Sequence, residues 1–132
     1  MKYVKLFEEA NRDARVMSLV AIAVEASVGL KIMHWQTRKF AQHDAFGKAY
    51  DDLALIFDKL VEMYFGKFGR QENDSFAFTI DIKDPVVFVE KIISMIVEWS
   101  NSLDDANEIE NVAEEAIGRL RQLQYLLTMD AE

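Results

Sequence analysis

A single proline, at position 85, interrupts the 132 residues of this chain. Proline breaks a helix interior because it lacks an N–H group and its ring clashes with the preceding turn. One proline and five glycines therefore leave room for long helices. Four segments carry apolar residues at the 3.6-residue spacing of an amphipathic helix. Together they predict an all-α fold, a four-helix bundle in a single domain over residues 1–132.

The first predicted helix covers about residues 6–38. The row expected to face the core consists of Val16, Val20, Ala23, Ser27 and Leu30, with His34 next in the same row. Ala26 and Gly29 provide small surfaces that let a neighbouring helix come close. His34 is therefore expected on or beside a buried face.

The other three helices are predicted at about residues 43–68, 84–99 and 104–127. The start of the third is the best defined, because Asp84 can cap a helix whose first residue is Pro85. The expected core rows are Phe46, Tyr50, Leu53, Phe57, Leu60 and Tyr64 in the second helix, Phe88, Ile92, Met95, Ile96 and Trp99 in the third, and Ile109, Val112, Ala116, Leu120, Leu123 and Leu127 in the fourth.

Residues 69–83 form the long connection, between the second and third helices. The other two connections are short and predict antiparallel hairpins. After turn residues at 69–74, Phe76, Phe78, Ile80 and Ile82 alternate with smaller or polar residues, a spacing typical of a strand. An extended segment of this length reaches about 50 Å. It can therefore cross the whole bundle, although a loop that folds back to give an up-down-up-down bundle is the alternative.

Charge and composition exclude several classes of function. The net charge of −8 disfavours DNA binding, which depends on Lys and Arg neutralising phosphates. The chain has no cysteine, so disulfides and thiolate metal sites are excluded. No apolar run approaches the roughly 20 residues of a membrane-spanning helix. The N-terminal residues lack the pattern of a secretory signal, and a cytoplasmic protein is expected.

Both histidines and a pair of carboxylates lie in the first half of the chain. His34 ends the first predicted helix, His43 begins the second, and Asp58 and Glu62 follow on one face of that helix because they are four residues apart. Imidazole and carboxylate ligands together suit Fe(II), Mn(II) or Zn(II). These four residues are the candidate metal ligands and, for a redox metal, the candidate catalytic residues.

Each candidate also has a simpler interpretation. A histidine at a helix end is more often a packing residue, and a surface Asp and Glu can pair with a nearby lysine such as Lys59. The helix face that carries Asp58 is partly apolar, with Ala54, Val61 and Phe65 around it. Burying two like charges there would be costly unless a cation or an interface partner were present.

His34-Trp35-Gln36, His43 and Asp58-x-x-x-Glu62, with Asp58 fifteen positions after His43, resemble the ferroxidase signature of the Dps-like mini-ferritins. The resemblance covers about residues 33–66. It implies a ferritin-like four-helix bundle with a long crossover between the second and third helices. It further implies that His34 and His43 of one subunit bind iron together with Asp58 and Glu62 of a two-fold-related neighbour, Glu62 bridging two ions. A dimer is then the minimum assembly, and a twelve-subunit shell is the family's form.

The sequence departs from this pattern at three places. Gly47 stands where the family has an acidic residue four positions after the second histidine, with Asp44 nearby. Residues 76–82 are extended in character where the family has a short helix at its dimer interface. No lysine-rich tail is present, which agrees with the argument against DNA binding.

The expected function is oxidation of Fe(II) by peroxide or oxygen at this shared site, with storage or detoxification of iron and protection against oxidative stress. Zn or Mn are the alternative metals. The second hypothesis is a structural or shell protein of the same fold that binds another metal or none. The third is a helical module that binds a protein partner and has no requirement for histidine.

Overall fold

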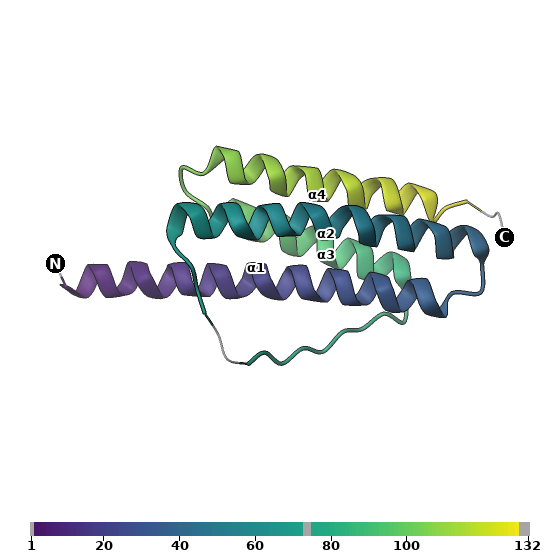
Figure 1. The fold of residues 1–132 in the computed structure, drawn as a ribbon, viewed down its shortest axis with the longest axis horizontal. Coiled ribbons are helices and arrows are strands. Elements are labelled where there is room, and N and C mark those ends of the chain that lie inside the picture. Colours follow the sequence, from purple (N-terminus) through teal and green to yellow (C-terminus); the bar gives the residue numbers. More distant parts are fainter. Residues whose placement is uncertain (1, 73–74, 130–132) are drawn as a thin grey trace.

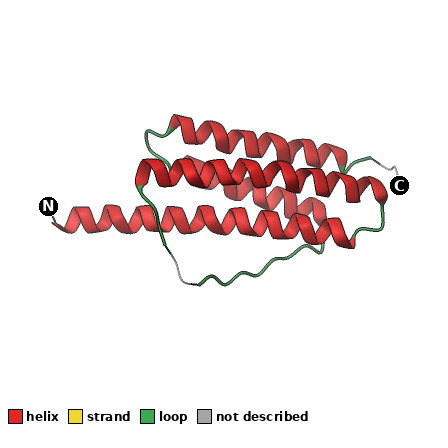
Figure 2. Cartoon of the chain, viewed as in Figure 1, coloured by secondary structure: helices red, strands yellow, loops and turns green. Residues whose placement is uncertain are grey.

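The computed structural model describes residues 2–72 and 75–129, and the side chains from residue 19 onward within that range. Four helices make up the fold: α1 (Lys2–Gln36), α2 (Phe40–Phe68), α3 (Pro85–Asn101) and α4 (Asn107–Leu126). Figure 2 shows that the connections between them are loops, and the described residues contain no strand. The predicted all-α four-helix bundle is confirmed.

The helices form two antiparallel hairpins joined by a crossover. In Figure 1, the segment between α2 and α3 returns along the bundle, so α3 begins at the end where α1 turns into α2. Helices α2 and α3 consequently run in the same direction. Among the described residues, α1 and α4 each contact α2 and α3, while α1 does not contact α4 and α2 does not contact α3. The predicted long crossover is confirmed, and the up-down-up-down alternative is wrong.

The crossover is extended but is not a strand. Ile80 and Ile82 pack against the core, whereas the rings of Phe76 and Phe78 stack on each other at 5.9 Å and remain 41% and 38% exposed. The alternating spacing therefore predicted the partial burial of Ile80 and Ile82, but it predicted neither the exposure of Phe76 and Phe78 nor the kind of element. A strand needs a neighbouring strand to accept its hydrogen bonds, and the described part of the chain offers none along this path.

The ends of the helices lie close to their predicted positions. The Asp84 carboxylate accepts hydrogen bonds from the backbone N–H of Val86 at 3.0 Å and of Val87 at 3.3 Å, which confirms it as the cap of α3. Helix α2 begins earlier than predicted, at Phe40. Helix α4 begins later, at Asn107, because Asp105 has a positive φ of 53° and belongs to the preceding turn.

The predicted core rows of α2, α3 and α4 are confirmed with small exceptions. All their members are buried except Tyr50, Met95 and Leu127, which are half-buried at the edge of the core.

The predicted core row of α1 is wrong for most of its members. The buried hydrophobic residues of this helix are instead Leu19, Ile22, Ala26, Leu30 and Met33, so among the described side chains only Leu30 was correctly placed. Val20, Ala23 and Ser27 are half-buried and line a shallow groove between α1 and α2 on the outside of the bundle. The side chain of Val16 lies outside the described residues.

A close contact between α1 and α3 fixes how α1 is rotated. The ring of Phe88 lies directly against Gly29, where a Cβ atom would overlap it. The same side of α1 carries Glu25, which is buried and accepts a hydrogen bond from Lys91 of α3 at 2.7 Å. These contacts leave the row of Val20, Ala23 and Ser27 half-buried at the edge of the core.

The opposite end of the bundle is held by Lys67, near the end of α2. Its ammonium group donates to the carbonyl oxygen of Asp105 at 2.6 Å and to the Glu108 carboxylate at 3.0 Å. The backbone N–H of Glu108 and, next, the Lys67 ammonium hold the pKa of this carboxyl below its usual value of 4.5.

None of the described helices combines the length and the apolar character needed to cross a membrane.

Replacing Gly29 by Ala should lower the free energy of unfolding by about 1–3 kcal/mol, the usual cost of overfilling a packed core. Without this contact, alanine in place of glycine in a helix interior would instead raise the free energy of unfolding by about 1 kcal/mol. Urea unfolding measures this difference. Gly66→Ala is the control, because a Cβ at that position meets no atom within 4 Å; a stabilised Gly29→Ala variant would contradict the role given to Phe88.

The contribution of Glu108 to stability should depend on pH. Because folding lowers its pKa, the stabilisation is present above pH 4.5 and is lost as the pH falls through the lower pKa of the folded protein. Glu108→Gln should therefore melt below the parent protein at pH 7 and level with it in strong acid. Thermal unfolding of both proteins across this range, with Glu114→Gln as the control, tests the prediction; a melting difference that does not change with pH would contradict it.

Candidate metal centre

His34 and His43 face each other across the short turn between α1 and α2. His34 lies in the last turn of α1, which ends at Gln36, and His43 lies in the first turn of α2, which begins at Phe40. Their rings stack with centroids 3.8 Å apart and an angle of 19° between the planes. The sequence predicted that both histidines belong to one site, and the structure brings them into contact.

Two reciprocal hydrogen bonds orient this pair. Nδ1 of His34 donates to the carbonyl oxygen of His43 at 2.6 Å, and Nδ1 of His43 donates to the carbonyl oxygen of His34 at 2.8 Å. A carbonyl oxygen can only accept, so each Nδ1 carries a proton and each neutral ring keeps its lone pair on Nε2. Neither Nε2 has a hydrogen-bond partner among the described residues. This is the arrangement in which metal-binding histidines are usually held.

The acidic residue expected beside His43 by resemblance is missing from the site. Gly47, one helical turn after His43, lies against the edge of the His34 ring that carries Nδ1 and Cε1. Asp44, the nearest acidic residue in the sequence, instead pairs with Lys48 at 2.9 Å. Within its own chain, the histidine pair therefore has no adjacent carboxylate ligand among the described residues.

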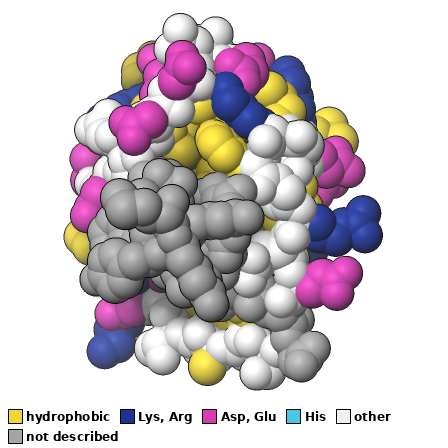
Figure 3. All heavy atoms as spheres, turned by 90° about the vertical axis from the view of Figure 1, so that its left-hand side faces the viewer, with side chains coloured by type: hydrophobic (Ala, Val, Ile, Leu, Met, Phe, Trp, Pro, Cys, Tyr) yellow, Lys and Arg dark blue, Asp and Glu magenta, His cyan; other side chains and the backbone are white. Residues whose placement is uncertain are grey.

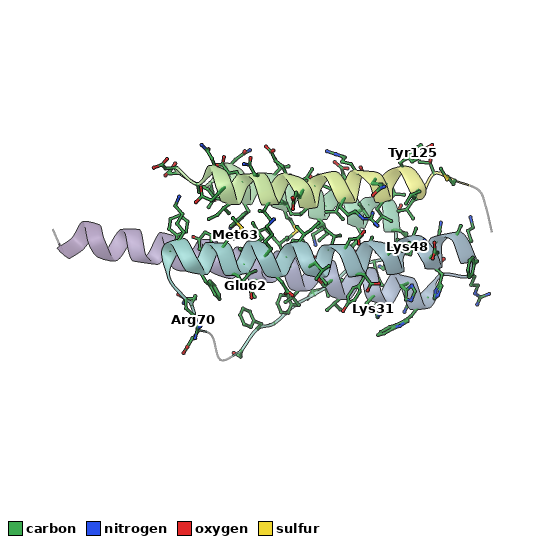
Figure 4. The ribbon with its side chains drawn as sticks, turned by 45° about the horizontal axis from the view of Figure 1, so that its top comes forward. Lys31, Lys48, Glu62, Met63, Arg70 and Tyr125 are labelled. Atoms are coloured by element: carbon green, nitrogen blue, oxygen red, sulfur yellow. The ribbon has the colours of Figure 1, made fainter. Side chains whose placement is uncertain are left out.

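Asp58 and Glu62 are exposed and line the groove between α1 and α2. In Figure 4, Glu62 projects on the side of α2 that faces the crossover, whereas Met63 lies on the side toward α4. Lys59 lies 4.0 Å from Glu115 of α4 and makes no ion pair with Asp58 or Glu62. Within the described part of the chain, Asp58 and Glu62 have no ion-pair partner.

The two candidate pairs of ligands are far apart in one chain. Fifteen residues separate His43 from Asp58, which corresponds to about 22 Å along the axis of α2. No three His, Asp or Glu side chains among the described residues are grouped so that they could hold a metal ion. One copy of the chain does not assemble all four ligands, and a site shared between two copies stays a prediction.

A cationic and aromatic cluster lies beside the histidine pair and was missed by the sequence analysis. The Lys31 ammonium lies 4.6 Å from the centre of the Tyr50 ring and 5.8 Å from that of Trp35, which is 67% exposed. The i, i+4 spacing of Lys31 and Trp35 on α1 was the available signal. At the other end of the bundle, Figure 3 shows hydrophobic side chains in its upper part with both acidic and basic side chains around them, and no histidine in view.

A relative is found in Enterobacteria phage T4. It is an uncharacterized 14.6 kDa protein from the mobD-ri intergenic region, and it is 22% identical over 126 residues, which cover 94% of this chain and 96% of the phage protein. No solved structure matches the chain.

The predicted membership in the mini-ferritins is wrong. The family whose model matches is a family of unknown function, DUF5856, and the match extends over residues 34–127, from the first histidine to the C-cap of α4. Neither this family nor the phage relative is described as ferritin-like or Dps-like. The short signature at residues 33–66 was therefore no guide to the family. The chain belongs to DUF5856.

Proposed function

We propose that this protein binds divalent transition-metal ions through His34 and His43 and that two copies complete the site with Asp58 and Glu62. The observation that carries the proposal is the histidine pair itself. Both Nδ1 atoms are engaged by backbone carbonyls, which leaves both Nε2 lone pairs available to a metal. The proposal rests on these residues and does not depend on membership in the mini-ferritins.

The stacked rings favour two ions over one. A lone pair of imidazole lies in the plane of its own ring, and the two planes are nearly parallel at a centroid distance of 3.8 Å. The two Nε2 atoms therefore cannot both point at a single ion without rotation of a ring. One ion for each ring, with carboxylates as further ligands, satisfies this geometry and agrees with ligands that suit Fe(II), Mn(II) or Zn(II).

The exposed surface of α1 and α2 favours a second copy of the chain as the source of the carboxylate ligands. Val20, Ala23 and Ser27 line an apolar groove that also carries Asp58 and Glu62. In a single chain the first three side chains stay half-buried and the two carboxylates are exposed. In a two-fold dimer, residue i meets residue j and residue j meets residue i. An antiparallel pair of α2 helices would place each His43 beside the carboxylates of the other copy, with the symmetry axis near residues 51 and 52.

Iron oxidation is the reaction we assign to this site. Two Fe(II) ions give one electron each, and with two protons they reduce one hydrogen peroxide to two water molecules. Fe(III) is a harder cation than Fe(II) and prefers oxygen ligands, so carboxylates beside the imidazoles stabilise the product. We place the reaction in the cytoplasm, as part of iron detoxification or storage.

A structural role is the second candidate. Both imidazoles already make hydrogen bonds that tie α1 to α2, and one of them satisfies the carbonyl oxygen of His34 in the last turn of α1. The pair can hold the hairpin together without any metal. This candidate predicts a shell or scaffold protein in which loss of a histidine changes stability only.

Association of two copies can be tested with single cysteines, because the natural chain has none. Ala54→Cys, in the groove and within a turn of that axis, should be joined between copies by a short bifunctional thiol crosslinker or, when spin-labelled, give a short distance between labels. Leu55→Cys is the control, because Leu55 is 72% exposed on the α4 side, in a pocket lined by residues of α2 and α4. Light scattering that finds only monomers, or equal crosslinking at positions 54 and 55, would contradict the proposed dimer.

The assignment of ligands is tested by Glu62→Gln and His34→Ala. Each should reduce the rate of Fe(II) oxidation by at least the 10–100-fold typical of changes around a metal site. Thermal unfolding should change far less for Glu62→Gln, whose side chain is exposed. Glu114→Gln, an exposed carboxylate of α4, is the control. If both variants oxidise iron at the parent rate and His34→Ala only lowers the melting temperature, the structural role is correct.

A further inference from the structure

We infer that Gly47 is the positioning residue of the histidine pair, because its missing side chain leaves the space in which the His34 imidazole lies. Through His34, this glycine holds both rings in the orientation that exposes Nε2. The consequence for metal binding rests on the proposed function. The consequence for the orientation of the rings does not, and the two can be measured separately.

The contact between Gly47 and His34 is too close for any other residue. A Cβ atom at position 47 would lie 2.8 Å from both Cε1 and Nδ1 of His34 and 3.7 Å from Nε2. Carbon atoms in contact are normally about 3.5–4.0 Å apart. The edge of the ring that would be pushed is the edge whose Nδ1 donates to the His43 carbonyl.

The His34 ring has little freedom to move aside. One face stacks on the His43 ring at 3.8 Å, and Nδ1 makes the 2.6 Å hydrogen bond. A displacement that relieves the contact with a Cβ therefore breaks the hydrogen bond or the stack. Without that bond the tautomer of His34 is no longer fixed, and Nε2 no longer has a set direction.

The helix bears a cost for this glycine. Glycine in a helix interior is about 1 kcal/mol less favourable than alanine. Gly118, in the middle of α4, is a matched position where a Cβ would meet no atom within 4 Å. Position 47 is also one turn from His43, where a carboxylate could join the same metal ion. Glycine there makes room for an imidazole and leaves oxygen ligands to another source.

The experiment compares Gly47→Ala, Gly118→Ala and the double variant His34→Ala/Gly47→Ala. Nitrogen-15 NMR of the imidazoles reports the two hydrogen-bonded Nδ1–H groups, urea unfolding reports stability, and a Co(II) titration followed by visible absorption reports ligand geometry. We expect Gly47→Ala to lose the Nδ1–H signal of His34 and to bind Co(II) about 10–100-fold more weakly. Gly118→Ala should keep both signals and become more stable.

The double variant distinguishes two reasons why alanine at position 47 could destabilise the protein. One is a clash with the His34 ring, and the other is a cost that does not involve this ring. With the imidazole removed, Gly47→Ala should stabilise the His34→Ala protein as Gly118→Ala stabilises the parent. Retention of both Nδ1–H signals in Gly47→Ala, or destabilisation that persists in the double variant, would overturn the inference. A parent protein that shows both signals but binds no Co(II) would overturn the proposed function and leave the role of Gly47 standing on the NMR result.

Discussion

The segment between α2 and α3 runs along the length of the bundle, and this crossover sets the direction of α3 and the arrangement of the four helices. Helix α3 spans about 26 Å, and an extended chain from Gly69 to Asp84 is long enough to run beside it. Because this segment returns to the end of the bundle at which α1 turns into α2, α3 runs parallel to α2. Among the described residues, α2 and α3 then lie diagonally opposite each other, and α1 contacts α2 and α3 but not α4.

The sequence predicted the fold class, the crossover and three of the four core rows, because each of those rows carries apolar side chains along most of its helix. Helix α1 is different, because it carries two apolar rows. Leu19, Ile22 and Ala26 mark one, while Val20, Ala23 and Ser27 mark the other. Periodicity cannot choose between two stripes of similar width. The choice is made by Phe88 against Gly29, a contact between residues nearly sixty positions apart.

Some features of the candidate site follow from the local sequence, and others depend on how the helices pack. The residue types and the spacing of Asp58 and Glu62 follow from helix geometry and could be read from the sequence. The reciprocal hydrogen bonds of His34 and His43 could not, because they depend on how α1 and α2 turn into each other. Gly47 was visible only as a departure from a pattern, and its contact with the His34 ring explains it. The family assignment failed because a signature of a few residues weighs less than a match over most of the chain.

The crossover also determines how the chain can tolerate change in length. Each hairpin is continuous in sequence, so most contacts within the bundle form between helices joined by short turns, and the crossover acts as a tether between two units. The entropy of closing such a tether grows only with the logarithm of its length, and doubling it costs about 0.6 kcal/mol. Insertions between Gly69 and Ser75 would therefore alter the reach of the tether without disturbing either hairpin. The same property makes an exchange of the α3–α4 hairpin between two copies a low-cost rearrangement, in which every helix keeps its neighbours.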